Sequence, residues 1–159
     1  MDLTTIPGVD VNTALKIISE IGRDISRWPT FKHFCAWLGL CPGTKISGGR
    51  RLNSRTSHNT NRAAITLRMS ASTLYRSRTA LGAHLRRMKA RMGPVDAITA
   101  TAHKMARILY FMMARKQDYS EAGESYYDEL HKEKTTRYLR KKARALGFEL
   151  VETKNADGE

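Results

Sequence analysis

The chain has 159 residues, of which 41% are hydrophobic, enough for one modest core but not for several independent ones. It carries 28 Lys and Arg against 15 Asp and Glu, a formal net charge of +13. This excess of positive charge does not indicate the fold, but it predicts strong attraction to polyanions, with nucleic acid as the first candidate. The sequence has no apolar run of 18 residues and no readable secretory signal, so we expect a cytoplasmic protein.

The first predicted element is a Pro-Gly turn followed by a helix. In "IPGVDVNTALKIISEIG", residues 6–22, apolar residues recur at helical spacing until Gly22. The segment looks like the hairpin and second helix of a helix-hairpin-helix unit, which holds backbone phosphate on hairpin amides and a helix N-terminus. Asp10 stands where that pattern usually has a second glycine, and its carboxylate would cap the helix but repel phosphate. The preceding helix would lie before Met1, so we expect a longer parent protein.

The second predicted helix is "FKHFCAWLG", residues 31–39, with Thr30 as its N-cap and an apolar stripe that favours a core position. Trp28 and Trp37 beside it are also expected in the core, although either could stack on a base. The two cysteines, Cys35 and Cys41, lack the spacing of a metal site. We therefore expect both to be reduced and structural, and this chain to bind no metal or other cofactor.

Residues 41–60 are rich in Gly, Ser, Thr, Asn and cations and have almost no apolar periodicity, which predicts a loop or a short irregular hairpin. Loops of this length inside a compact domain are usually functional or disordered.

Helical spacing resumes at Asn61 and continues to residue 116, with a predicted break near Gly82 and a second one at Gly93-Pro94. In the helix after Pro94, six residues are expected to face the core: Val95, Ile98, Ala102, Met105, Leu109 and Met112. A last helix is predicted from Gly123 to Leu146, closed by Gly147. No βαβ alternation or internal repeat is visible, so the predicted fold is mainly α.

This organisation predicts one domain over residues 3–116, made of the helix-hairpin-helix remnant (6–22), the basic loop (41–60) and the helices of 61–116. A C-terminal helical extension would occupy residues 117–152, and residues 153–159 would form a disordered tail.

The charges are unevenly distributed along the chain. Between Asp24 and Asp96 there are 71 residues without Asp or Glu, and they include fourteen Lys or Arg. Like charges repel and ordinary surfaces mix both signs, so an external polyanion explains this segment better than a solubilising surface does. The C-terminal part interleaves acids and bases, as a solvent-exposed or partner-binding helix would.

The acid-free segment limits the chemistry of the chain. Metal-ion catalysis on nucleic acid needs several carboxylates to hold the cations, and this segment has none. Another domain could supply them, the reaction could use a covalent nucleophile, or the chain could only bind. Ser47 has the neighbours of a nucleophile, namely Gly48 and Gly49 for close approach and Arg50 and Arg51 as phosphate clamps. On composition alone, however, a serine beside Gly-Gly is more commonly a turn or phosphate-contact residue.

Several stretches together identify a resemblance, chiefly "WLGLCPGTKISGG" and "AITATAHKMARILY". Over about Leu3 to Val151 the chain resembles the C-terminal domain of the DEDD-type insertion-sequence transposases, bacterial recombinases guided by a bridge RNA. In that family a RuvC-like N-terminal domain carries the acidic metal-binding residues, and a serine in a Ser-Gly-Gly motif is the proposed nucleophile. Ser47-Gly48-Gly49 matches this motif, which implies that Ser47 is catalytic and that Mg²⁺ binds on a domain absent from this chain.

The resemblance further implies DNA, guide RNA and a RuvC-like domain of the same or another subunit as partners, with a homo-oligomer formed through helices. The nucleic-acid-binding residues are then expected to be Lys45, Arg50, Arg51, Arg55, His58, Asn61, Arg62 and Arg68. The chain departs from many relatives at Arg50, where they have Lys, and at Ser54 and His58, where they have Gly and Lys.

The leading hypothesis is therefore a catalytic and nucleic-acid-binding domain of a transposase, inactive in isolation. The alternative is a non-catalytic DNA- or RNA-binding module in which Ser47 only hydrogen-bonds to phosphate. An assembly role of the last helix is compatible with either.

Overall fold

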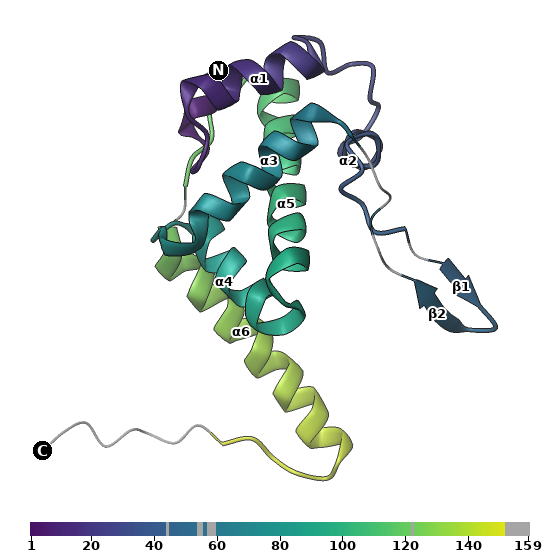
Figure 1. Ribbon diagram of the computed structural model, residues 1–159. Coiled ribbons are helices and arrows are strands. Elements are labelled where there is room, and N and C mark those ends of the chain that lie inside the picture. The colour runs from purple at the N-terminus through teal and green to yellow at the C-terminus, as the bar shows by residue number, and fades with distance from the viewer. Residues whose placement is uncertain (44, 54–55, 57–59, 122, 152–159) are drawn as a thin grey trace, which may run out of the picture.

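The computed structural model describes residues 1–43, 45–53, 56, 60–121 and 123–151 of the chain. Within them lie six α-helices, two short 3-10 helices and one two-stranded hairpin (Figure 1). The mainly α fold expected from the sequence is confirmed.

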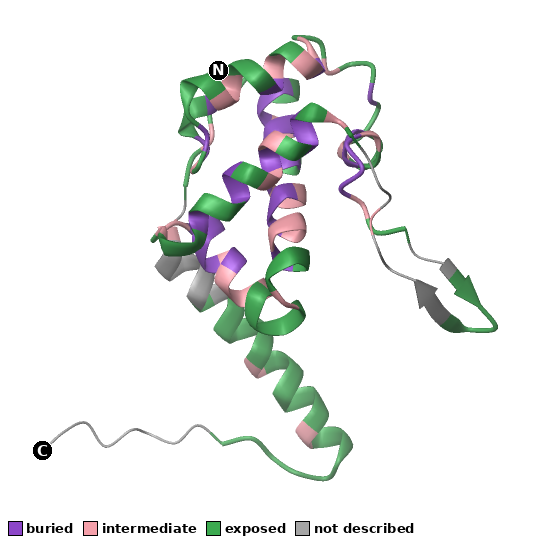
Figure 2. Ribbon diagram, in the orientation of Figure 1, coloured by how far each residue is buried: buried purple, intermediate pink, exposed green. Residues whose placement is uncertain are grey.

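The long helix α5 (Pro94–Arg115) forms the axis of the fold. It packs against α2 (Phe31–Trp37), α3 (Arg62–Thr73) and α4 (Ala80–Met92), as Figure 1 shows. Its buried residues cover a broad face, which is purple in Figure 2, and include Ala102, Met105 and Leu109. A helix that is surrounded in this way draws its stability from tertiary packing rather than from local propensity.

The Pro-Gly turn near the N-terminus rests on α3. A 3-10 helix, η1 (Leu3–Thr5), leads through the turn into α1 (Val11–Ile21), and α1 packs against α3. Gly8 has a φ of +82°, and a Cβ there would lie 2.9 Å from the carbonyl oxygen of Ser70, so the turn approaches α3 too closely for a side chain. Asp10 caps α1 by accepting a 2.7 Å hydrogen bond from the amide of Thr13, as expected for its carboxylate.

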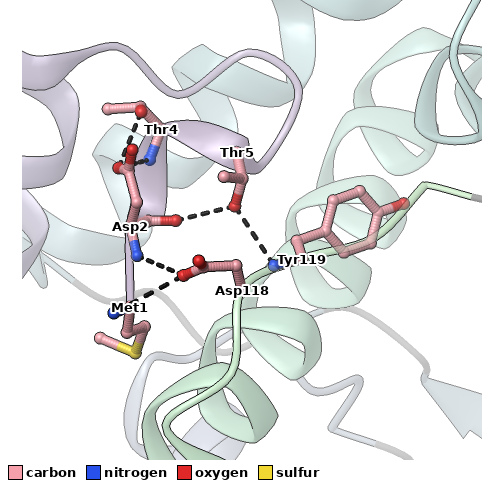
Figure 3. A network of polar contacts seen from close by, with 6 residues as sticks. All are labelled: Met1, Asp2, Thr4, Thr5, Asp118 and Tyr119. Atoms are coloured by element: carbon pink, nitrogen blue, oxygen red, sulfur yellow. Dashed lines mark hydrogen bonds and ion pairs between the residues drawn. The ribbon is translucent and has the colours of Figure 1, made fainter.

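A polar network fixes the start of the chain to the segment after α5 (Figure 3). Asp118 accepts a hydrogen bond from the amide of Asp2, and Thr5 accepts one from the amide of Tyr119 at 3.2 Å. Asp2 in turn caps η1 by accepting from the amide of Thr4. These contacts join the first and last parts of the helical body.

The break between α3 and α4 differs from the prediction. It lies at residues 74–79, where the 3-10 helix η2 (Leu74–Arg76) is followed by Thr79, the N-cap of α4. Gly82, where the break was predicted, lies inside the first turn of α4. A Cβ at Gly82 would stand 2.2 Å from the carbonyl oxygen of Ser77, so the glycine permits close packing rather than interrupting the helix.

The second break, at Gly93-Pro94, is confirmed, with a φ of +87° at Gly93 and Pro94 as the first residue of α5. The prediction that Val95 faces the core was wrong, because its side chain is 75% exposed. Val95 belongs to the first turn of α5, at the exposed end of the helix, which is green in Figure 2. Ile98, one turn further along, is already partly buried against the core.

The predicted last helix is present as α6 (Gly123–Ala145), which packs against α4. Beyond this contact α6 continues away from the helical body (Figure 1), and most of the residues from 131 to 145 are exposed. The amide of Phe148 bonds to the carbonyl of Ala143, and Gly147 has a φ of +80°, which is the usual geometry of a helix end. The tail predicted over residues 153–159 lies outside the described residues.

Candidate nucleic-acid interface

A β-hairpin occupies the middle of the basic loop, as one of the two sequence interpretations had it. Its strands, β1 (Lys45–Ser47) and β2 (Arg50–Asn53), are antiparallel and pair Ser47 with Arg50. Gly48 and Gly49 form the two-residue turn, with φ values of +56° and +74°. A type I′ turn requires positive φ at both positions, which glycine adopts without steric cost.

Ser47 is exposed beside the tip of this hairpin, which projects from the helical body (Figure 1). Gly48 and Gly49 are exposed as well, and a Cβ added to either would meet nothing within 4 Å. Arg50, opposite Ser47 on the neighbouring strand, is also exposed. The tip thus leaves the space beside the Ser47 hydroxyl open and places a cationic residue across from it.

The Ser47 hydroxyl has no hydrogen-bond partner within the part of the chain that the structure describes. A general base that activates a serine has to lie within hydrogen-bond reach of its hydroxyl. The described residues supply an accessible hydroxyl but no such base.

Asn61 and Arg62 lie where α3 begins. The Asn61 side-chain oxygen accepts a 3.2 Å hydrogen bond from the amide of Ala64, which makes Asn61 the N-cap of the helix. Arg62 is the first helical residue and is exposed. The positive end of the helix dipole and the Arg62 guanidinium favour an anion at the same point.

Arg68 is half-buried one and a half turns further along α3, and its guanidinium donates a 3.3 Å hydrogen bond to the carbonyl of Gly39. This bond ties α3 to the end of α2, just before the chain leaves for the hairpin. The sequence predicted Arg68 only as a nucleic-acid-binding residue. Its hydrogen bond to Gly39 gives it a structural role as well.

Of the other predicted site residues, Lys45 and Arg51 lie in β1 and β2, but the structure does not describe their side chains. Arg55 and His58 lie outside the described residues.

Arginines stacked on aromatic rings form a feature that sequence reasoning missed. Arg27 lies 4.5 Å from the ring centroid of Trp28, and Arg107 lies 4.8 Å from that of Phe31. Trp28 is buried, as expected, while Trp37 is half-buried at 4.8 Å from it. Because Arg107 and Phe31 are far apart in sequence, no local spacing could have revealed their contact.

Cations also crowd the packed faces of α4 and α5. Burial and the nearby Arg87, Arg107 and Lys134 lower the pKa of Lys104 to about 8. Burial, with Lys104 and Arg87, lowers the pKa of His84 to about 4. The positive charge therefore extends from the exposed hairpin into the partly buried helical body, where each cation disfavours the charge on the next.

Both cysteines are free, and burial raises the pKa of the Cys35 thiol to about 12. Among the described residues no group of three or more His, Cys, Asp or Glu side chains could hold a metal ion. In the same part of the chain, no helix is both long and apolar enough to cross a membrane.

The molecule is thus a basic, mainly helical domain that carries a serine on a projecting glycine-turn hairpin. Its residues 2–86, more than half of the chain, match the model of the Transposase IS116/IS110/IS902 family. The chain belongs to this family of insertion-sequence transposases, whose function is DNA recombination by transposition and whose substrate is DNA. The matched region includes α1, α2, the hairpin and α3 and ends within α4. No curated protein and no solved structure matches the chain.

Proposed function

We propose that this chain is the serine-bearing, nucleic-acid-binding domain of a transposase and that Ser47 attacks a DNA phosphodiester. The observation that carries the proposal is the exposed Ser47 beside a Gly-Gly turn, on a hairpin within the acid-free segment. A DNA strand can approach such a tip closely because the two glycines present no side chains.

In the proposed reaction, the Ser47 hydroxyl loses its proton as its oxygen bonds to phosphorus, one P–O bond of the DNA strand breaks, and the departing oxygen takes up a proton. The departing strand end leaves as a hydroxyl, and the protein stays covalently joined to the other end until strand exchange reverses the step. Arg50 and Arg51 would neutralise charge on the phosphate, while Lys45, Arg55 and Arg62 would hold neighbouring phosphates. His58, Asn61 and Arg68 complete the proposed nucleic-acid-binding set.

We propose that the acidic residues that bind the metal ion for this reaction lie on another domain. The described residues offer no cluster of ligands suited to a divalent cation, and residues 25–95 contain no carboxylate side chain. We therefore assign Mg²⁺ binding to a RuvC-like domain of the same or another subunit, and no step within this chain proceeds through a metal. The protein is expected to act in the cytoplasm. In isolation, the chain is expected to bind nucleic acid but not to recombine it.

A guide RNA is the second proposed partner. RNA and DNA present similar phosphates, and the basic segment has enough cations to contact both. A homo-oligomer, assembled through helices, would bring the hairpin of one subunit to the acidic domain of another.

The test restores the RuvC-like domain and the guide RNA and compares wild type with Ser47→Ala. Ser47→Ala is expected to lose strand cleavage and the covalent protein–DNA product while its DNA affinity stays within about two-fold. Ser19→Ala, an exposed serine on α1, serves as the control and should behave as wild type. Normal cleavage by Ser47→Ala would remove the nucleophile proposal.

The second candidate is a non-catalytic binding module. It is favoured by the absence of a described hydrogen-bond partner for the Ser47 hydroxyl. In this case Ser47 donates one hydrogen bond to a phosphate, and Ser47→Ala weakens DNA binding several-fold without abolishing cleavage.

A further inference from the structure

The outer half of α6, residues 134–145, is an exposed helix surface with many cations. Between Glu133 and Glu149 there is no Asp or Glu, and six cations fall within eleven residues. They are Lys134, Arg137, Arg140, Lys141, Lys142 and Arg144, all of them exposed. This half of α6 also lies beyond residue 86, where the family match ends.

The six cations are spread around the helix rather than confined to one row. At 100° per residue they cover an arc of about 200° of the helix circumference. Tyr138, which is 62% exposed, falls inside this arc. The opposite side carries Thr135, Thr136, Leu139 and the half-buried Ala143, so the helix has one cationic side and one uncharged side.

Helix stabilisation alone does not explain this arrangement. Cations in the last turn of a helix offset its dipole, which accounts for Lys142 and Arg144. Lys134 and Arg137 lie about three and two turns before the helix end at Ala145, where the dipole effect has fallen off. Arg137, Lys141 and Arg144 also form no ion pair with any carboxylate in the described part of the chain. Their charges are available to an external polyanion.

A hollow of about 780 Å³ runs along one edge of this cationic side. Thr136, Arg137, Arg140, Lys141 and Arg144 line its outer part, whereas Glu129, Lys132 and Glu133 line the end nearer the helical body. The outer part thus has four cations and no acid, so a polyanion that lies along α6 is attracted to it more strongly than to the inner end.

We propose that the outer half of α6 binds duplex DNA by lying in the major groove, where its two cationic flanks reach the phosphates of both groove walls. The proposal rests on the DNA-binding function proposed above and adds a second, separate contact surface. The major groove of B-DNA admits an α-helix, whereas the major groove of A-form RNA is too narrow for one. A cationic arc of about 200° fits a groove with phosphates on two sides better than a flat surface. Lys141, in the middle of the arc, would then face the groove floor, with Tyr138 to one side of it.

The test uses the 159-residue chain and measures binding to a 20-base-pair DNA duplex by fluorescence anisotropy over a series of salt concentrations. The variant Arg137→Gln/Lys141→Gln/Arg144→Gln is compared with Lys16→Gln/Arg23→Gln/Lys116→Gln. Both variants remove three exposed cations, so they have the same net charge. The α6 variant is expected to lose about 10- to 100-fold in affinity, and its salt slope should fall by about two to three, since each lost phosphate contact lowers the slope by about 0.9. The control should keep the wild-type slope.

Two further arms make the outcome decisive. A duplex RNA of the same sequence should show little difference between the α6 variant and the control, because its groove does not admit the helix. The variant Arg137→Lys/Arg144→Lys keeps the charge and should retain binding, while circular dichroism verifies that every variant keeps its helix content. Equal losses in the α6 variant and the control, an unchanged α6 variant, or an equal loss on RNA would each overturn the proposal. None of these results depends on whether Ser47 is the nucleophile.

Discussion

The hydroxyl of Tyr110 donates a 3.0 Å hydrogen bond to the backbone carbonyl of Trp28, 82 positions away in the sequence. Both residues are buried, and the Tyr110 ring also packs 5.9 Å from the ring of Phe34. The bond joins the central helix α5 to the segment between α1 and α2. It thereby helps to hold α2, from whose end the chain leaves for the hairpin.

Tyr110→Phe is expected to destabilise the protein by about 1 to 2 kcal/mol, because the buried carbonyl of Trp28 loses its partner while the ring packing is kept. Urea denaturation followed by circular dichroism measures this as a lower midpoint with an unchanged slope. Tyr138→Phe, at an exposed position on α6, is the control and should leave the midpoint in place. An unchanged midpoint in Tyr110→Phe would show that the hydrogen bond contributes nothing net.

The helices were predictable because their apolar residues recur at helical spacing and because Gly and Pro mark several ends, as at Gly93-Pro94. The predictions were wrong where tertiary contacts determine the helix boundaries and the burial of side chains. A helix break was predicted near Gly82 because glycine is a poor helix former. In the structure, this glycine instead allows α4 to lie close to the carbonyl of Ser77. Val95 has the spacing of a core residue but is 75% exposed, since it lies in the exposed first turn of α5.

The candidate site was predictable in part. The Gly-Gly pair after Ser47 is a local turn signal, and it forms the hairpin turn. The bond from Arg68 to Gly39 spans 29 residues, and the contact of Arg107 with Phe31 spans still more. Contacts of that range leave no periodic signal in a single sequence, so the structural roles of these two arginines could not be predicted.

His84 is expected to make the stability of the protein depend on pH. Its ring contacts the Thr101 hydroxyl at 3.2 Å between α4 and α5, and burial next to Lys104 and Arg87 lowers its pKa from 6.5 to about 4. The unfolded chain therefore binds one more proton than the folded chain between these values. The stabilisation is fully present above pH 6.5 and is lost as the pH falls towards 4. Because the ring is partly exposed, we expect a loss of about 1 to 2 kcal/mol.

The measurement compares urea denaturation at pH 7 and pH 4.5 for wild type and His84→Gln. The variant cannot take up this proton, so its stability should fall less than that of wild type over the same interval. His33→Gln, at an exposed position on α2, should keep the full pH dependence. The same loss in wild type and His84→Gln would assign the pH dependence to other groups.

The turn of the hairpin should depend on the conformation of Gly48 and not on space around it. Gly48 has a φ of +56°, and a Cβ there would have nothing within 4 Å, so only backbone strain opposes a side chain. Asn tolerates this left-handed region, whereas a β-branched residue does not. Gly48→Asn is therefore expected to keep the hairpin and Gly48→Val to lose it, as measured by nuclear Overhauser contacts between Ser47 and Arg50.

Both Gly48 variants should unfold within about 0.5 kcal/mol of wild type, because the tip residues are exposed and outside the core. Loss of the turn in Gly48→Val should nevertheless weaken DNA binding and, in the full-length transposase, strand cleavage, since Ser47 and Arg50 no longer stand opposite each other. Thermal denaturation and a binding titration on the same samples separate the two effects. A large fall in the melting temperature of Gly48→Val would mean that the hairpin stabilises the helical body. Equal behaviour of the Asn and Val variants would mean that the positive φ at Gly48 does not determine the turn.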